Sequence, residues 1–230
     1  FRFGHPPNDS PDGVAWYAQF ELARMKRMDE IGLKACIANW STGYPDLSWW
    51  PEFLPALEYA NDHGHILGLH EYSSPWIWWM TGKYQVDPTE DAGDEGWTTL
   101  RYRKVWRQHI VPNGFTKLKL AITEFGLERI QHIRPGMQDG NFATMRGWWN
   151  AQNSAVGEIP YDPDHEIYYA KQLERYDREL QKDDYVLGAT IFTVGNTGGP
   201  WDEYDVAGTR TSAELRRYFS IGAGDPPDTG

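Results

Sequence analysis

Residues 118–126 read LKLAITEFG, and this stretch decides how the rest of the chain is interpreted. It is rich in aliphatic residues, as a short buried strand is, and it ends on a carboxylate followed by glycine. In a regular strand Leu120, Ile122 and Glu124 point to the same side. A carboxylate on an apolar face is costly unless it is paired or used. Glu124 is therefore a candidate catalytic nucleophile; the structural alternative is a glutamate that caps a neighbouring helix.

Strand-like and helix-like segments alternate along the chain. Besides 118–126, strands are predicted at residues 1–4, 33–39, 66–72 and 186–194. Helices are predicted at residues 12–32, 51–62, 98–111, 165–182 and 212–218. In the first helix Asp12 is the expected N-cap, and the expected inward stripe is Trp16, Phe20, Ala23, Met25 and Met28. The irregular stretch 127–163 is too long for a plain connection and predicts a functional rim or lid.

Five strand–helix units in series predict an α/β fold with a parallel sheet. No GxGxxG follows the first strand and no P-loop occurs, which disfavours a nucleotide-binding sheet. Polar and aromatic residues stand at the strand ends, where a (β/α)8 TIM barrel places its chemistry. Since a full barrel usually needs about 250 residues, the prediction is one TIM-barrel-type domain over residues 1–221, incomplete with about five βα units. A flexible tail at 222–230 is expected to follow.

Composition restricts the class of protein. A net charge of −11 and a pI near 5.0 argue against a nucleic-acid or anionic-membrane surface, and no apolar run is long enough to span a bilayer. Twelve Trp and 13 Tyr offer flat faces for sugar rings, although such faces also stack on peptides or bases. The single Cys36 predicts a buried free thiol. His63 and His65 precede a strand at the end opposite His70, so no metal site is predicted.

The strand ends also carry a resemblance to a known family. The segments 70–72 (HEY), 123–126 (TEFG) and 189–192 (ATIF), the last leading to Asn196 and Trp201, resemble the last three strands of clan A glycoside hydrolases. The wider runs IANWSTGYPD, LGLHEYSSP, RYRKVWRQ, ITEFG and ELQKDDYVLGATIF are similar to bacterial clan A-like proteins, as barrel strands four to eight. The resemblance implies a retaining (β/α)8 enzyme in which Glu124 is the nucleophile and Tyr72 hydrogen-bonds to it.

The second carboxylate of such an enzyme is harder to place. The family's acid/base glutamate lies in an Asn-Glu-Pro motif at the end of the fourth strand, where this sequence has His5-Pro6. Glu71 has the opposite parity to His70 and Tyr72, so it would replace the acid only at an irregular strand end. Asp9 and Asp12 are weaker substitutes.

The sequence thus predicts a retaining glycoside hydrolase that acts on β-linked oligo- or polysaccharide without a cofactor. The expected catalytic residues are Glu124, Glu71, His70 and Tyr72, and the expected substrate-binding residues are Asn39, Trp40, Trp76, Trp148, Asn196 and Trp201. A carbohydrate-binding barrel without the acid/base, or part of a longer hydrolase, are the alternatives. Open strand edges favour a homo-oligomer, while the sugar, its linkage and the compartment stay open.

Overall fold

The computed structural model describes residues 9–82, 93–128, 141–145, 159, 161–196 and 198–221. The predicted strand at 1–4, the tail at 222–230 and most of the predicted rim lie outside this part. The chain divides into two compact units. Unit 1 comprises Phe1–Tyr72, Trp79–Phe125 and Leu180–Thr190, and unit 2 comprises Ser73–Trp78, Gly126–Glu179 and Ile191–Gly230. The single domain expected over 1–221 stays a prediction.

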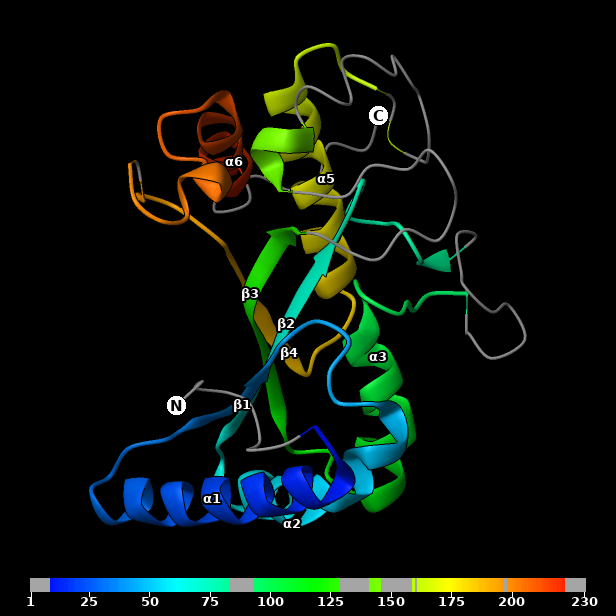
Figure 1. Cartoon of the computed structure of the whole chain (residues 1–230), viewed down its shortest axis with the longest axis vertical. Coiled ribbons are helices and arrows are strands. Elements are labelled where there is room, and N and C mark those ends of the chain that lie inside the picture. Colours follow the sequence, from blue (N-terminus) through cyan, green and yellow to red (C-terminus); the bar gives the residue numbers. More distant parts are fainter. Residues whose placement is uncertain are drawn as a thin grey trace. The chain divides into compact units, whose positions relative to one another are not determined.

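A parallel four-stranded sheet with helices forms the framework, which confirms the predicted α/β class. Its strands are β1 (Cys36–Trp40), β2 (Ile66–Ser73), β3 (Lys119–Leu127) and β4 (Val186–Ile191). Their order in the sheet is their order in the chain, as successive βαβ units produce. The carboxyl ends of β2 and β3 therefore lie side by side (Figure 1). The barrel itself stays a prediction.

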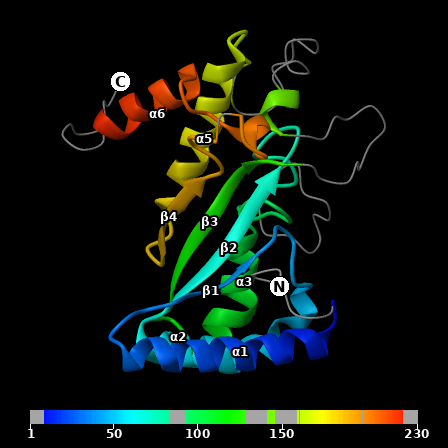
Figure 2. The same ribbon diagram turned by 60° about the vertical axis from the view of Figure 1, so that its left-hand side comes forward.

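The helices of unit 1 precede β1, β2 and β3 in the chain. They are α1 (Pro11–Glu30), η1 (Leu47–Phe53), α2 (Leu54–His63) and α3 (Arg101–Val105), which continues as η3 (Trp106–Ile110) and η4 (Val111–Asn113). Figures 1 and 2 show α1 and α2 side by side near the amino ends of β1 and β2. The N-cap of α1 is Ser10, not the expected Asp12, because the Ser10 Oγ accepts from Gly13 N at 3.2 Å and Pro11 takes the first helical position.

The inward face of α1 differs from the prediction. Trp16 and Phe20 stack on each other but are 50% and 43% exposed. The buried residues are Gly13, Val14, Tyr17, Ala18, Glu21 and Met25. Tyr17 lies on this face and packs against Trp40 and Phe53. The prediction is confirmed for Met25, which is buried, and wrong for Trp16 and Phe20, because the buried face also contains a glutamate that an apolar pattern passes over.

Unit 2 is built on α5 (His165–Leu180), η5 (Asp202–Tyr204) and α6 (Arg210–Ile221). Asp164 caps α5: its Oδ1 accepts from Glu166 N and Ile167 N. The Tyr218 hydroxyl of α6 donates to Asp177 Oδ2 of α5 at 2.9 Å, which ties these two helices together. Within the described residues, every helix is too short or too polar to cross a bilayer.

Candidate active site

Three predicted catalytic side chains meet at the carboxyl ends of β2 and β3. The Tyr72 hydroxyl donates to Glu124 Oε2 at 2.9 Å, and His70 Nδ1 lies 3.3 Å from the same oxygen. The Glu124 side chain is 37% exposed and the His70 side chain 18%. The carboxylate is therefore held from one side by two polar partners and still reaches solvent. The shared parity of His70 and Tyr72 brings both to Glu124, as the sequence predicts.

Glu124 itself leaves the side predicted from the parity of its strand. Leu120 and Ile122 are buried as expected, but Phe125, Gly126 and Leu127 are then buried in succession, so the alternation in burial ends after Ile122. The Glu124 carboxylate contacts Tyr72 and His70 of β2 and therefore lies on their face of the sheet. The cost of a carboxylate in an apolar layer is avoided.

A threonine that sequence reasoning missed holds the end of β2. The Thr42 hydroxyl donates to the His70 carbonyl oxygen at 3.2 Å and accepts from Tyr72 N at 2.8 Å. This one side chain fixes the backbone on both sides of Glu71. Thr42 lies in the loop after β1, where no motif distinguishes it from an ordinary loop residue.

Asn39, a predicted substrate-binding residue, lies on the same side of the sheet as His70 and Tyr72. A side chain built at Gly68, which has the parity of these two residues, would come within 2.3 Å of Asn39 Oδ1. Asn39 Oδ1 accepts a hydrogen bond from Thr123 Oγ1 at 2.8 Å. Glycine at position 68 therefore leaves the space in which the Asn39 amide reaches the residue before Glu124.

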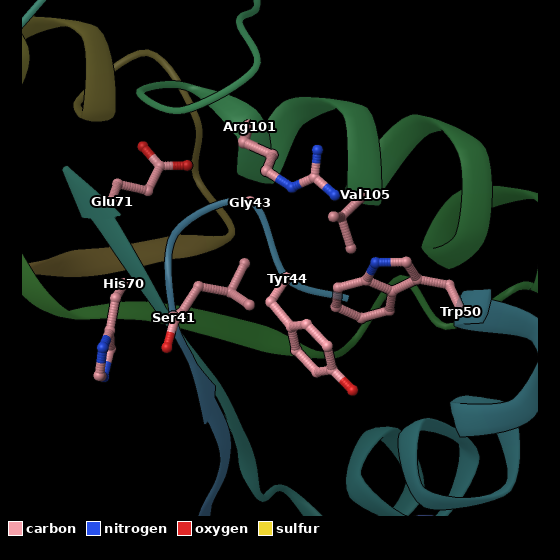
Figure 3. Close-up of a pocket in the computed structure, with 9 residues that line it drawn as sticks. Ser41, Gly43, Tyr44, Trp50, His70, Glu71, Arg101 and Val105 are labelled. Atoms are coloured by element: carbon pink, nitrogen blue, oxygen red, sulfur yellow. The ribbon is translucent and has the colours of Figure 1, made fainter. Parts of the chain in front are cut away.

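Glu71 does not join this cluster. It is fully buried, its Oε2 accepts from Leu100 N at 2.7 Å, and its Oε1 accepts from Tyr102 N at 2.8 Å. Figure 3 shows the Glu71 and His70 side chains leaving β2 in opposite directions. The structure therefore does not bring this predicted catalytic residue to Glu124: the pleat of β2 turns Glu71 toward the start of α3, where it binds backbone N–H groups that the helix leaves unpaired.

A small cavity lies beside Glu71 (Figure 3). Its volume is about 10 Å³, roughly the space that one water molecule needs. The buried Arg101 lines it and donates to the Pro45 carbonyl oxygen at 2.7 Å. Burial lowers the pKa of Arg101 to about 10, and the negative charge of Glu71 opposes this effect. The cavity is too small for a sugar ring.

Trp40 does not form a sugar platform. Its side chain is fully buried, with ring centroids of Phe53 and Trp50 at 4.4 and 5.0 Å. Tyr17 and Tyr44 complete the cluster. The structure therefore places this predicted binding residue in the hydrophobic core on the helix side of the sheet and not with Glu124.

The remaining predicted binding residues belong to unit 2. Trp76 is buried and stacks with Trp78, at 6.2 Å between centroids, so packing accounts for it. Trp201 is 51% exposed, in edge contact with Phe192 and Tyr204. Asn196 is half-buried and its backbone N–H donates to an aspartate of the same unit at 2.9 Å. Trp148 lies outside the described residues.

The described histidines and the single cysteine form neither a metal-binding group of three or more side chains nor a disulfide. Among the described residues, no group of three or more His, Cys, Asp or Glu side chains could hold a metal ion. His63 and His65 lie 3.2 and 3.3 Å from one oxygen of Asp29, at the amino end of the sheet. Cys36 is a free, half-buried cysteine, and burial raises the pKa of its thiol to about 11.

Comparison of the chain with protein-family models, with curated proteins and with solved structures finds no match.

Proposed function

We propose that the chain carries the nucleophile side of a retaining glycosidase site, in a fold of the (β/α) barrel type, and that it acts on β-linked carbohydrate. The observation that supports this proposal is the Tyr72–Glu124–His70 cluster. A glutamate at the carboxyl end of a parallel strand, half-exposed and bound by a tyrosine hydroxyl, is suited to attack an electrophilic carbon above the strand ends.

The cluster suits the attacking step for a physical reason. A hydrogen bond donated to a carboxylate stabilises the charged form, and the charged form is the nucleophile. The bond from Tyr72 reaches Oε2, which fixes the rotation of the carboxylate and leaves Oε1 for the anomeric carbon. Attack then forms a glycosyl ester at Glu124 and releases the leaving group, and water hydrolyses the ester in the second step.

The protonation of the leaving group needs a second carboxylate about 5–5.5 Å from the first. Glu71 does not supply it, since backbone N–H groups occupy both of its oxygens. Substrates whose leaving group needs no protonation bypass this step. Dinitrophenyl glycosides are such substrates, so they report on the attacking step without an acid/base residue.

The test is hydrolysis of dinitrophenyl β-glycosides of several sugars by the wild type and by the Glu124→Gln variant. Loss of the nucleophile predicts a fall in kcat of at least about a thousandfold, as for other residues that form a covalent intermediate. Glu58→Gln, at an exposed position of α2, is the matched control and keeps the wild-type rate. Equal rates in the wild type and in Glu124→Gln would refute the proposal.

A second candidate is a carbohydrate-binding protein without turnover. It is favoured by the engagement of Glu71 at α3, which removes the predicted acid. Titration calorimetry with β-linked oligosaccharides separates the two. Binding by a protein that does not cleave any dinitrophenyl glycoside would support this second function and exclude the first.

A further inference from the structure

We propose that Glu21, a buried glutamate of α1, is a positioning residue that holds the Asn39 amide beside Glu124. This inference rests on the proposed function, since it treats Asn39 as a substrate-binding residue. It adds a role for a side chain that lies outside the strand-end cluster and that no motif marks.

The backbone at the end of β1 is strained. Ala38 and Asn39 have φ angles of 69° and 53°, a left-handed conformation that is unfavourable for L-residues and that glycine adopts freely. The pairing of β1 with β2 skips Asn39: Ala38 pairs with Gly68, and Trp40 pairs with Leu69. Two consecutive left-handed residues without glycine persist only where the surroundings hold them.

Three side chains of α1 supply that restraint. Glu21 Oε1 accepts from Ala38 N at 3.0 Å, and the Tyr17 hydroxyl lies 2.8 Å from the same oxygen and 3.2 Å from the Ala38 carbonyl oxygen. Arg24 Nε donates to Glu21 Oε2 at 2.7 Å, and its NH2 donates to the Cys36 carbonyl oxygen. Glu21 is fully buried, and each of its oxygens has a partner. Side chains of α1 thus bind both polar groups of the Ala38 backbone.

The restraint determines where the Asn39 amide lies. Its Oδ1 accepts from Thr123 Oγ1, and its Nδ2 donates to the Cys36 carbonyl oxygen at 3.2 Å. An amide nitrogen has two hydrogens, and in this proposal the second is the donor to a substrate hydroxyl. The contact with Thr123, the residue before Glu124, keeps the amide at this end of β3. Were Ala38 and Asn39 to relax to an extended conformation, the amide would leave the space above Gly68.

The experiment is a double-mutant cycle on dinitrophenyl β-glycosides. Glu21→Gln and Asn39→Ala are each expected to lower kcat/KM by about tenfold, because the first weakens the restraint on Ala38 and the second removes the amide itself. In the Asn39→Ala background, Glu21→Gln is expected to have no further effect, because the side chain it positions is gone. Glu30→Gln, an exposed glutamate of the same helix, is the control and keeps the wild-type value.

A rescue variant separates positioning from general stability. Glycine adopts positive φ without the steric cost of alanine, so Ala38→Gly is expected to restore part of the kcat/KM lost in Glu21→Gln. If Glu21→Gln does not fold, Tyr17→Phe takes its place in the experiment. This variant removes the hydroxyl that lies beside both Glu21 and Ala38. The same cycle with Asn39→Ala then applies.

Nitrogen-15 NMR of the Asn39 side-chain amide tests the inference without reference to activity. Glu21→Gln is expected to shift this signal and to speed the exchange of the Ala38 amide, and Ala38→Gly to move the Asn39 signal back toward its wild-type position. Failure of the wild type to cleave any glycoside would refute the proposed function but not the positioning role. Unchanged Asn39 and Ala38 signals in Glu21→Gln, or an equal fall in kcat/KM with and without Asn39, would overturn the positioning role.

Discussion

The replacement Glu71→Gln tests whether this carboxylate anchors a helix or serves as an acid. Two backbone N–H groups, of Leu100 and Tyr102, end on its two oxygens in a buried setting. Glutamine keeps one carbonyl oxygen and offers an NH2 group where the other oxygen stood. One of the two backbone N–H groups, of Leu100 or Tyr102, then loses its acceptor and faces the NH2 group of the glutamine. The other keeps a hydrogen bond, but to a neutral oxygen in place of a charged one. We expect a loss of about 2–4 kcal/mol in the free energy of unfolding.

Urea denaturation followed by tryptophan fluorescence measures this loss as a lower midpoint. The control is the exposed Glu58→Gln, for which the change stays within about 0.5 kcal/mol. Activity per folded Glu71→Gln molecule is expected to match the wild type for both activated and unactivated glycosides. The reasoning would be refuted by a variant of wild-type stability that has lost turnover of unactivated glycosides only, because that result is the signature of an acid.

Three further predictions follow from the same geometry. Tyr72→Phe removes a hydrogen bond to the nucleophile carboxylate, so kcat on dinitrophenyl glycosides falls about 10- to 100-fold; an unchanged kcat would contradict its supporting role. Gly68→Ala would place a Cβ 2.3 Å from Asn39 Oδ1 and lower stability by about 1–3 kcal/mol, whereas Gly93→Ala, with open space around it, leaves Tm unchanged. Burial lowers the pKa of His65, so the unfolded chain takes up a proton at a higher pH than the folded protein. Stability present above the unfolded pKa of about 6.5 is lost as the pH falls through the folded pKa, and urea midpoints across this range should lose that dependence in His65→Asn.

Much of the sheet could be predicted from the sequence because strand parity is a local property. The run 66–72 gave the bounds of β2 to within one residue, and the pleat placed His70 and Tyr72 on one side and Glu71 on the other. The same rule therefore argued against Glu71 as the acid, although the residue stayed among the candidates. The alternation of side chains between the two faces of a strand depends on the strand alone, so it was predicted correctly for the regular strand β2.

The predictions failed where the backbone departs from regular geometry or where a polar residue is buried. The alternation of β3 ends after Ile122, and Glu124 contacts His70 and Tyr72 instead of continuing the face of Leu120 and Ile122. The left-handed Ala38 donates its backbone N–H to Glu21 of α1, 17 residues earlier in the sequence, and nothing in the local pattern indicates such a contact. The inward face of α1 was missed for the same reason, since Glu21 interrupts the apolar stripe that a helical pattern looks for.

Covalent trapping tests the central claim most directly. Dinitrophenyl glycosides with fluorine in place of the C2 hydroxyl slow both steps but keep a good leaving group, so a glycosyl ester accumulates on the nucleophile. Intact-mass measurement and peptide mapping are expected to show one glycosyl group on the peptide that contains Glu124, and none in Glu124→Gln. Absence of an adduct with every sugar tried, or an adduct on Glu71 or another carboxylate, would contradict the assignment of Glu124 as the nucleophile.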